Sequence, residues 1–253
     1  SGFTGSAGMA VILKNKNYLF VDGRYTIQAE KECAKNFKVI ETNKSFSSSI
    51  FNDLTLGFDP KLFTTKKIKT FFSGKVKLNL IKKNLIDQIY KYKLIKTKSF
   101  FSLSKNITGE NYKSKINKVI TFLKKNKIDY LFISAPENVA WLLNIRGYDN
   151  PNSPIPNCRI VIGKNKDLFL ISNKQKTSML RKENKISLNQ LIEPEQFETL
   201  INKLKGKYFS IDAQSCSIFN EKIIRSNFKI KEISDPCYKF KSIKNSTEIR
   251  NMI

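Results

Sequence analysis

Short apolar runs alternate with longer amphipathic stretches along most of the chain. Runs of three to five residues rich in Val, Ile, Leu and Phe predict strands, at 9–13, 18–21, 56–58, 76–80, 130–134, 159–162, 168–171 and 208–211. Stretches of mixed apolar and charged residues with helical periodicity or start signals predict helices, at 25–35, 61–72, 84–90, 110–126, 136–143, 174–181, 194–204 and 217–225. Helices that recur between strands indicate an α/β architecture with mixed sheets.

The periodic pattern is lost between about residues 95 and 107, where Ser, Lys and Thr dominate, so we expect a linker there. The 253 residues suffice for two domains of about 100–150 residues each. We predict a first domain at 1–100 and a second at 108–236. Residues 237–253 are expected to be a linker and the start of a further domain, because Asn245 or Ser246 with Glu248 in the first turn marks a helix start.

The formal net charge of +25 raises the question of a nucleic-acid partner. Arginine occurs at only six positions, however, and the lysines are spread along the whole chain, whereas phosphate and base recognition favours the forked guanidinium. A compositional bias toward Lys therefore explains the charge better. We expect no specific nucleic-acid partner, although salt-sensitive binding to polyanions should occur. No apolar run reaches the roughly 18–20 residues of a membrane-spanning helix, so we expect no membrane partner.

Histidine is absent, which excludes a histidine general base and an imidazole metal ligand within these 253 residues. The four cysteines form no CxxC pair, so unpaired buried thiols in a reducing compartment are expected. No cluster of carboxylates or thiolates suggests a metal site. We therefore expect neither catalytic nor metal-binding residues in this chain.

Two segments are distinctive. Asp22-Gly23-Arg24 lies at a predicted strand-to-helix turn, where a rare arginine suggests a bidentate bond to a carboxylate or to carbonyl groups. Residues 136–147 hold the single tryptophan, Trp141, and end in Arg146-Gly147. The tryptophan is most simply a core residue, and a cation followed by glycine suits a helix end. A functional role for Arg146 remains open.

Three segments resemble the large, three-domain Xaa-Pro aminopeptidases of the creatinase/aminopeptidase P family. They are SGFTGSAGMAV with LFVDGRYTIQAE, then NVAWLLNIRGYDNPNSP, then KSIKNSTEIRNMI. Their order and rough spacing match across nearly the whole chain, and KNLIDQIY fits the end of the first domain. The resemblance implies two creatinase-type N-terminal domains, each a mixed β-sheet flanked by helices, with the first domain truncated at its N-terminus.

The resemblance also implies an activity for a longer protein: release of the N-terminal residue that precedes proline. In the family two divalent metals, usually manganese, perform this chemistry in a later domain, whose ligands would lie beyond Ile253. The chain alone should then be inactive. The resemblance implies a cytoplasmic protein in which these domains pack against their own catalytic domain. It also implies that the full protein forms a homodimer and takes proline-containing peptides as substrates. Arg146, Asp149 and Asn150 become candidate substrate-binding residues. A stand-alone binding or scaffold module with this fold is the alternative.

Overall fold

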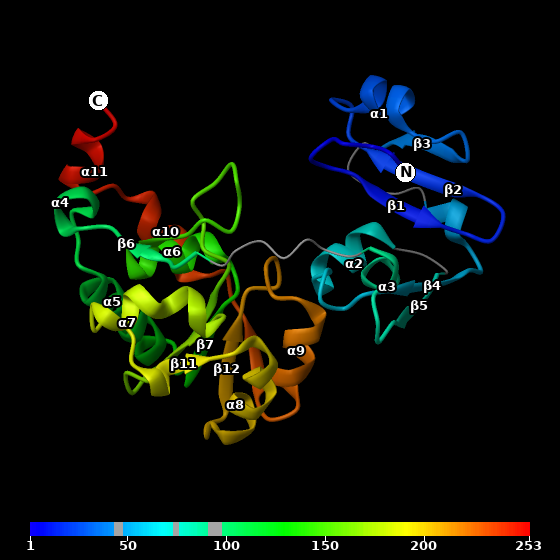
Figure 1. Cartoon of the computed structure of the whole chain (residues 1–253). Coiled ribbons are helices and arrows are strands. Elements are labelled where there is room, and N and C mark those ends of the chain that lie inside the picture. Colours follow the sequence, from blue (N-terminus) through cyan, green and yellow to red (C-terminus); the bar gives the residue numbers. More distant parts are fainter. Residues whose placement is uncertain (43–47, 73–75, 91–97) are drawn as a thin grey trace. The chain divides into compact units, whose positions relative to one another are not determined.

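The computed structural model describes residues 1–42, 48–72, 76–90 and 98–253 (Figure 1). The chain divides into two compact units. Unit 1 comprises residues 1–57 and 67–79, and unit 2 comprises residues 58–66 and 80–253. Mixed sheets flanked by helices confirm the predicted fold class. The predicted domain boundaries near residues 100, 108 and 236 stay a prediction.

Unit 1 is built on a three-stranded mixed sheet in the order β1-β2-β3. Strand β1 (Met9–Ile12) pairs antiparallel with β2 (Asn17–Val21), as the predicted hairpin requires. Strand β3 (Phe37–Glu41) pairs parallel with β2 after helix α1 (Thr26–Glu32). We did not predict β3, whose residues are only half-buried or exposed and give a weak apolar signal.

The two faces of the unit 1 sheet carry separate apolar clusters, because successive strand residues point to opposite faces. Phe20 packs with Val11 and Phe51 on one face. Its neighbours Leu19 and Val21 pack with Ala29 of α1 on the other. Alternation within one strand thus builds two small cores.

The segment after β3 holds short elements: η1 (Ser48–Phe51), β4 (Thr55–Phe58), α2 (Thr65–Phe71) and β5 (Lys77–Leu80), with β4 and β5 paired in a two-stranded sheet. Helix α2 begins four residues later than predicted. The Asp59 carboxylate accepts a hydrogen bond from the Lys61 amide at 2.8 Å, and the Asp59 carbonyl accepts one from Leu62. Asp59 therefore forms a turn where the helix was expected to start.

Unit 2 contains a six-stranded sheet in the order β11-β10-β9-β7-β12-β13. Its strands are β7 (Tyr130–Ile133), β9 (Arg159–Gly163), β10 (Leu168–Ile171), β11 (Leu191–Ile192), β12 (Tyr208–Ile211) and β13 (Lys229–Glu232). Strand β9 runs antiparallel to both neighbours, and the remaining pairs are parallel. The four inner strands were predicted. The two edge strands were not, because β11 has two residues and β13 alternates with charged ones.

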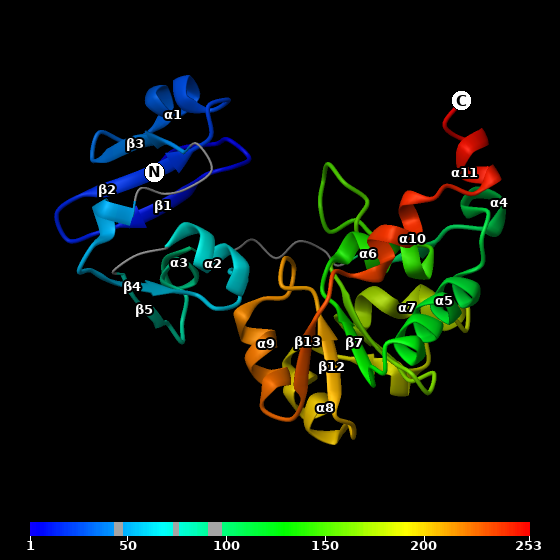
Figure 2. The ribbon, with the colours of Figure 1, turned by 180° about the vertical axis from the view of Figure 1, so that it is seen from behind.

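Helices cover both faces of the unit 2 sheet (Figures 1 and 2). One face packs against α5 (Tyr112–Lys125), α6 (Pro136–Leu143), α7 (Ser178–Lys182) and α10 (Pro236–Ser242). The other packs against α8 (Phe197–Lys203) and α9 (Ile218–Arg225). The Asp235 carboxylate accepts from the Cys237 amide at 2.9 Å and caps α10, with proline in the first turn.

Short elements complete unit 2: α3 (Leu85–Ile89), β6 (Phe101–Ser102), α4 (Lys105–Thr108), β8 (Ile145–Arg146), η2 (Lys174–Thr177), η3 (Leu188–Gln190), η4 (Pro194–Gln196) and α11 (Ser246–Arg250). The predicted linker near 95–107 thus contains β6 and α4, and Phe100 beside them is fully buried. The part of that prediction on residues 95–97 lies outside the described residues. Helix α11 starts at the predicted Asn245 cap.

Candidate functional site

Arg24 forms the bidentate pair that the sequence suggested, and its role is structural. Its Nε and Nη2 atoms donate to the two Asp22 carboxylate oxygens at 3.1 and 2.7 Å. The same Asp22 also accepts from the Arg24 amide at 3.0 Å. The pair closes the turn between β2 and α1. The Arg24 side chain is largely exposed, so the pair contributes little to stability.

The end of helix α6 fixes the position of Arg146. Asn144 adopts the left-handed conformation with φ 52°, and its Nδ2 donates to Thr108 Oγ1 at 3.1 Å and to the Glu110 carbonyl at 2.8 Å. Asn144 therefore ends the helix, which corrects our prediction that Gly147 would. Strand β8 follows at once and pairs antiparallel with β6, which sets Arg146 opposite Phe101.

Gly147 instead allows two loop segments to approach closely. A Cβ atom built on it would lie 2.8 Å from the Pro156 Cα atom and 3.0 Å from Phe100 Cδ1. Such distances leave no room for a side chain. The glycine thus permits Pro156, near the other end of the loop of residues 147–157, to pack directly against the backbone next to Arg146.

The Arg146 guanidinium is half-buried and mostly uncommitted. Its Nη1 atom donates to the carbonyl of the adjacent Ile145 at 2.8 Å. Among the described residues it makes no ion pair, and burial lowers its pKa from the ordinary value. The remaining N–H groups could bind a carboxylate or carbonyl group of another molecule.

Asp149 and Asn150 hold the loop together rather than contacting Arg146. The Asp149 carboxylate accepts from the Asn157 amide at 2.6 Å and pairs with the Lys176 ammonium. Asn150 forms a bridge with Ser153 and accepts from the amide of Asn152 at 3.1 Å. Arg146 ends strand β8, and Asp149 and Asn150 lie in the loop that follows it, but the polar groups of the three residues face different partners.

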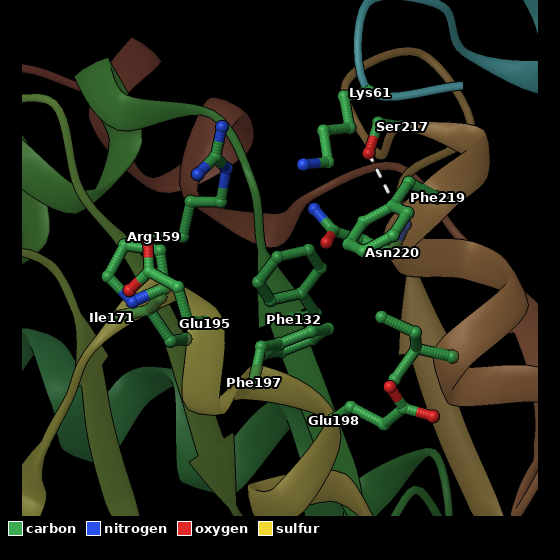
Figure 3. A pocket seen from close by; sticks show the side chains of 12 residues that line it. Lys61, Phe132, Arg159, Ile171, Glu195, Phe197, Glu198, Ser217, Phe219 and Asn220 are labelled. Atoms are coloured by element: carbon green, nitrogen blue, oxygen red, sulfur yellow. Dashed lines mark hydrogen bonds between the residues drawn. The ribbon is translucent and has the colours of Figure 1, made fainter. Parts of the chain in front are cut away.

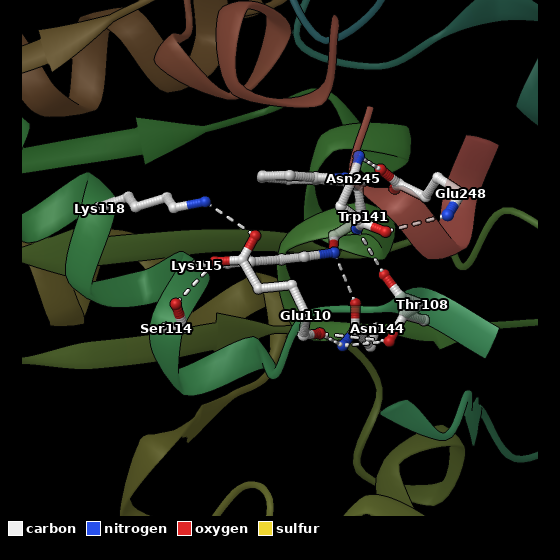
Figure 4. A network of polar contacts seen from close by, with 9 residues as sticks. All are labelled: Thr108, Glu110, Ser114, Lys115, Lys118, Trp141, Asn144, Asn245 and Glu248. Carbon is white, nitrogen blue, oxygen red and sulfur yellow. Dashed lines mark hydrogen bonds and ion pairs between the residues drawn. The ribbon is translucent and has the colours of Figure 1, made fainter. Parts of the chain in front are cut away.

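Lys115 is a buried cation at the C-terminal end of helix α6 (Figure 4). The residue is only 1% exposed to solvent. Its Nζ atom donates to the Trp141 carbonyl at 3.0 Å and to Asn144 Oδ1 at 2.8 Å. The ammonium also lies 4.2 Å from the centre of the Trp141 ring. Burial lowers the Lys115 pKa to about 8, against the opposing attraction of Glu248 and Glu110.

We did not predict a role for Lys115, although the sequence carries a signal for it. Lys115 stands four and eight positions before Val119 and Leu123, which places it on the buried face of the predicted helix 110–126. A lysine at such a position has to find partners for its charge. Those partners come from α6, a separate element.

The same network joins the chain's last helix to α4. Asn245 Oδ1 accepts from the Glu248 amide at 2.9 Å while its Nδ2 donates to the Thr108 carbonyl at 2.9 Å. Asn251 adds a bond to the Ile107 carbonyl at 3.1 Å. Helix α11 is thus docked on the elements that surround Lys115 (Figure 4).

In the described ranges, no group of three or more cysteine or acidic side chains is placed to hold a metal ion. The residues present therefore do not fit a metal centre, and no metal chemistry is assigned to them. None of the helices in the described ranges is long and apolar enough to span a membrane.

Known proteins match the chain along its whole length. It is 28% identical to Xaa-Pro aminopeptidase 1 of Dictyostelium discoideum, covering 100% of this chain and 43% of that protein. It is 29% identical to the Xaa-Pro aminopeptidase ApepP of Drosophila melanogaster, covering 100% and 44%. The chain therefore spans less than half the length of these relatives.

A solved structure shows the same fold. The X-prolyl aminopeptidase of Caenorhabditis elegans, described as a cytosolic enzyme with a di-nuclear active site, superposes with a TM-score of 0.83 at 21% identity. The match covers 100% of this chain and 44% of that one. Two domain profiles, both described as the Creatinase/Prolidase N-terminal domain, match residues 1–78 and 92–248. The chain belongs to the Creatinase/Prolidase N-terminal domain family.

Proposed function

We propose that this chain is the non-catalytic front portion of an Xaa-Pro aminopeptidase, a metallopeptidase that releases the N-terminal residue preceding proline. One observation carries the proposal: the whole chain matches less than half the length of Xaa-Pro aminopeptidases from two distant organisms. The hydrolytic chemistry then belongs to a part of the protein that these 253 residues do not contain. The front domains support that part and pack the subunits of a homodimer.

The proposal extends to the metal and to the compartment. The nematode relative has a di-nuclear active site and is cytosolic. By analogy, we place two divalent metals, manganese by preference, on residues outside this chain, and we place the protein in the cytoplasm. Proline-containing peptides are its substrates.

We also propose that the loop carrying Arg146, Asp149 and Asn150 faces the peptide. Arg146 supports this role best, because its guanidinium is half-buried and, within the described parts of the chain, hydrogen-bonded only to the Ile145 carbonyl. It would bind a carbonyl or carboxylate of the substrate through its free N–H groups. Asp149 and Asn150 would set the loop's shape around that contact.

The test uses the protein extended through the reading frame downstream of Ile253, assayed with an Xaa-Pro peptide and Mn²⁺. Replacing Arg146 by Gln should reduce kcat/KM at least about tenfold, because a charged hydrogen bond to substrate is lost. Arg24→Gln is the matched control, since among the described residues Arg24 forms an ion pair only with its neighbour Asp22 and otherwise lies over the Tyr25 ring. Equal activity of the Arg146 variant and the control would contradict the proposed contact.

A further inference from the structure

A pocket of about 210 Å³ opens at the carboxyl edge of the unit 2 sheet (Figure 3). It lies where β7 and β10 end and β9 begins, since Arg159 pairs with Ile171 beyond the end of β7. The chain runs from β7 to β9, β10 and β11 on one side, and then crosses to β12 on the other. In open α/β sheets such a switch in strand order is where ligands bind.

The floor of this pocket is apolar and largely aromatic. Phe132 and Phe197 are buried side chains whose ring centres lie 5.0 Å apart. Phe219, Ile171 and Ile223 add to this apolar part of the lining. A ligand seated here would lay an apolar or aromatic group on these rings.

Several polar side chains around the floor are uncommitted, whereas Ser217 Oγ accepts a hydrogen bond from the Asn220 amide at 3.3 Å. Within the described residues, no hydrogen bond or ion pair engages the side chains of Arg159, Glu198 or Asn220. Lys61 reaches only the face of the Phe219 ring, at 5.1 Å from its centre. Figure 3 shows the cations of Arg159 and Lys61 on one side of the Phe132 and Phe197 rings and Glu198 on the other.

We propose that this pocket binds a small zwitterion with an apolar or aromatic body, the chemistry of a free apolar α-amino acid. The Arg159 fork, with Lys61 beside it, would take the carboxylate. Glu198 would take the ammonium group, and the phenyl rings would take the side chain. The volume lies below the roughly 300–1,000 Å³ of sites for drug-sized ligands, which favours a molecule of this size.

The pocket is separate from the Arg146 loop, because no residue of that loop lines it. The inference rests on the unit 2 sheet and its pocket alone. It would therefore survive failure of the peptidase proposal, and its own failure would leave that proposal intact.

The test titrates L-phenylalanine into the ¹⁵N-labelled 253-residue chain and follows amide chemical shifts. We expect saturable shifts concentrated at the residues that line the pocket, among them Arg159, Ile171, 194–198 and 217–223. Arg159→Gln should weaken binding at least about tenfold, the cost of losing one charged hydrogen bond. Arg250→Gln removes the same charge from α11, outside the pocket lining, and should leave the affinity unchanged.

Two analogues separate the charges of the ligand. 3-Phenylpropanoate lacks the ammonium group and 2-phenylethylamine lacks the carboxylate, so each should bind at least about tenfold more weakly than phenylalanine. Glu198→Gln, at an exposed position, should abolish the difference between phenylalanine and 3-phenylpropanoate without affecting the fold. The absence of saturable shifts, or equal binding by wild type and Arg159→Gln, would overturn the proposal, as would equal binding of phenylalanine and both analogues.

Discussion

Lys115 is a cation in a buried environment, which its chemistry disfavours. Its pKa falls to about 8 in the folded protein because the side chain is buried, whereas in the unfolded chain it has its ordinary value of 10.5. Between these two values the unfolded chain binds more protons, so the free energy of unfolding rises as the pH rises from about 8 toward 10.5. Below about pH 8 Lys115 is charged in both states, and burying this charge lowers the free energy of unfolding by an amount that does not change with pH.

We predict that Lys115→Met removes the increase in the free energy of unfolding between about pH 8 and pH 10. From pH 7.5 to pH 10, the wild type should gain about 2–3 kcal/mol relative to the variant, at 1.36 kcal/mol for each unit of pKa difference. Denaturant unfolding followed by Trp141 fluorescence measures it, because the single tryptophan lies against the Lys115 ammonium. Lys118→Met is the control, since Lys118 is a half-exposed cation on the same helix. Parallel pH profiles for the wild type and Lys115→Met would show that the lysine is not buried as described.

Asn144 is a second single residue on which the stability of unit 2 should depend. Its replacement by Ala strains a left-handed backbone position and removes the acceptor of Lys115 and the donor to Thr108. We expect a loss of about 2–4 kcal/mol in the free energy of unfolding. Asn126→Ala, at the exposed end of α5 with φ −94°, should cost less than about 1 kcal/mol. Equal losses in the two variants would contradict the role given to the Asn144 side chain.

Some single residues could be predicted from the sequence and others could not. The bidentate bonding of Arg24 was predictable because its partner, Asp22, lies two positions away. The bonding of Lys115 was not, because its partners lie 26 and 29 positions away on another helix. The same reason applies to Asp149, whose partner Lys176 comes from η2. The sequence indicates a polar residue at a buried position, but not what it meets there.

At the scale of elements, the side chain of Asn245 holds α11 in place. Asn245 caps the helix through Glu248 and also bonds to the Thr108 carbonyl. Asn245→Ala should release α11 from α4, with at least about fivefold faster hydrogen exchange at Ile249 and Asn251, consistent with a cap worth about 1 kcal/mol or more. Ser246→Ala changes an exposed residue in the first helical turn, one position after the cap, and should leave the exchange unchanged. Unaltered exchange in Asn245→Ala would contradict the docking.

The elements themselves were predictable where their apolar pattern was strong. Strands β7, β9 and β10 are almost entirely buried and read as continuous apolar runs, so they were found. Edge strand β13 alternates with lysine and glutamate, and α10 follows an Asp-Pro pair that resembles a stop signal. In both cases the tertiary contact, not the local pattern, decides the structure.

At the scale of the whole molecule, each unit buries a core of its own on both faces of a mixed sheet. The three matching segments predicted this arrangement because they occur in the order that the family has them. The pocket beside Arg159 was not predictable, since it joins Lys61 with residues from η4, α8, α9 and three strands that are distant in sequence. We therefore propose two separate sites in unit 2: the loop after Arg146, which would face the peptide, and the pocket beside Arg159, which would bind a small zwitterion.

Hydrolysis of an Xaa-Pro peptide in the presence of Mn²⁺ tests the central claim most directly. The 253-residue chain is assayed beside the protein extended through the reading frame downstream of Ile253. We predict turnover by the extended protein and none by the chain alone, which would place the chemistry outside these residues. Turnover by the chain alone, or none by either protein, would contradict the account.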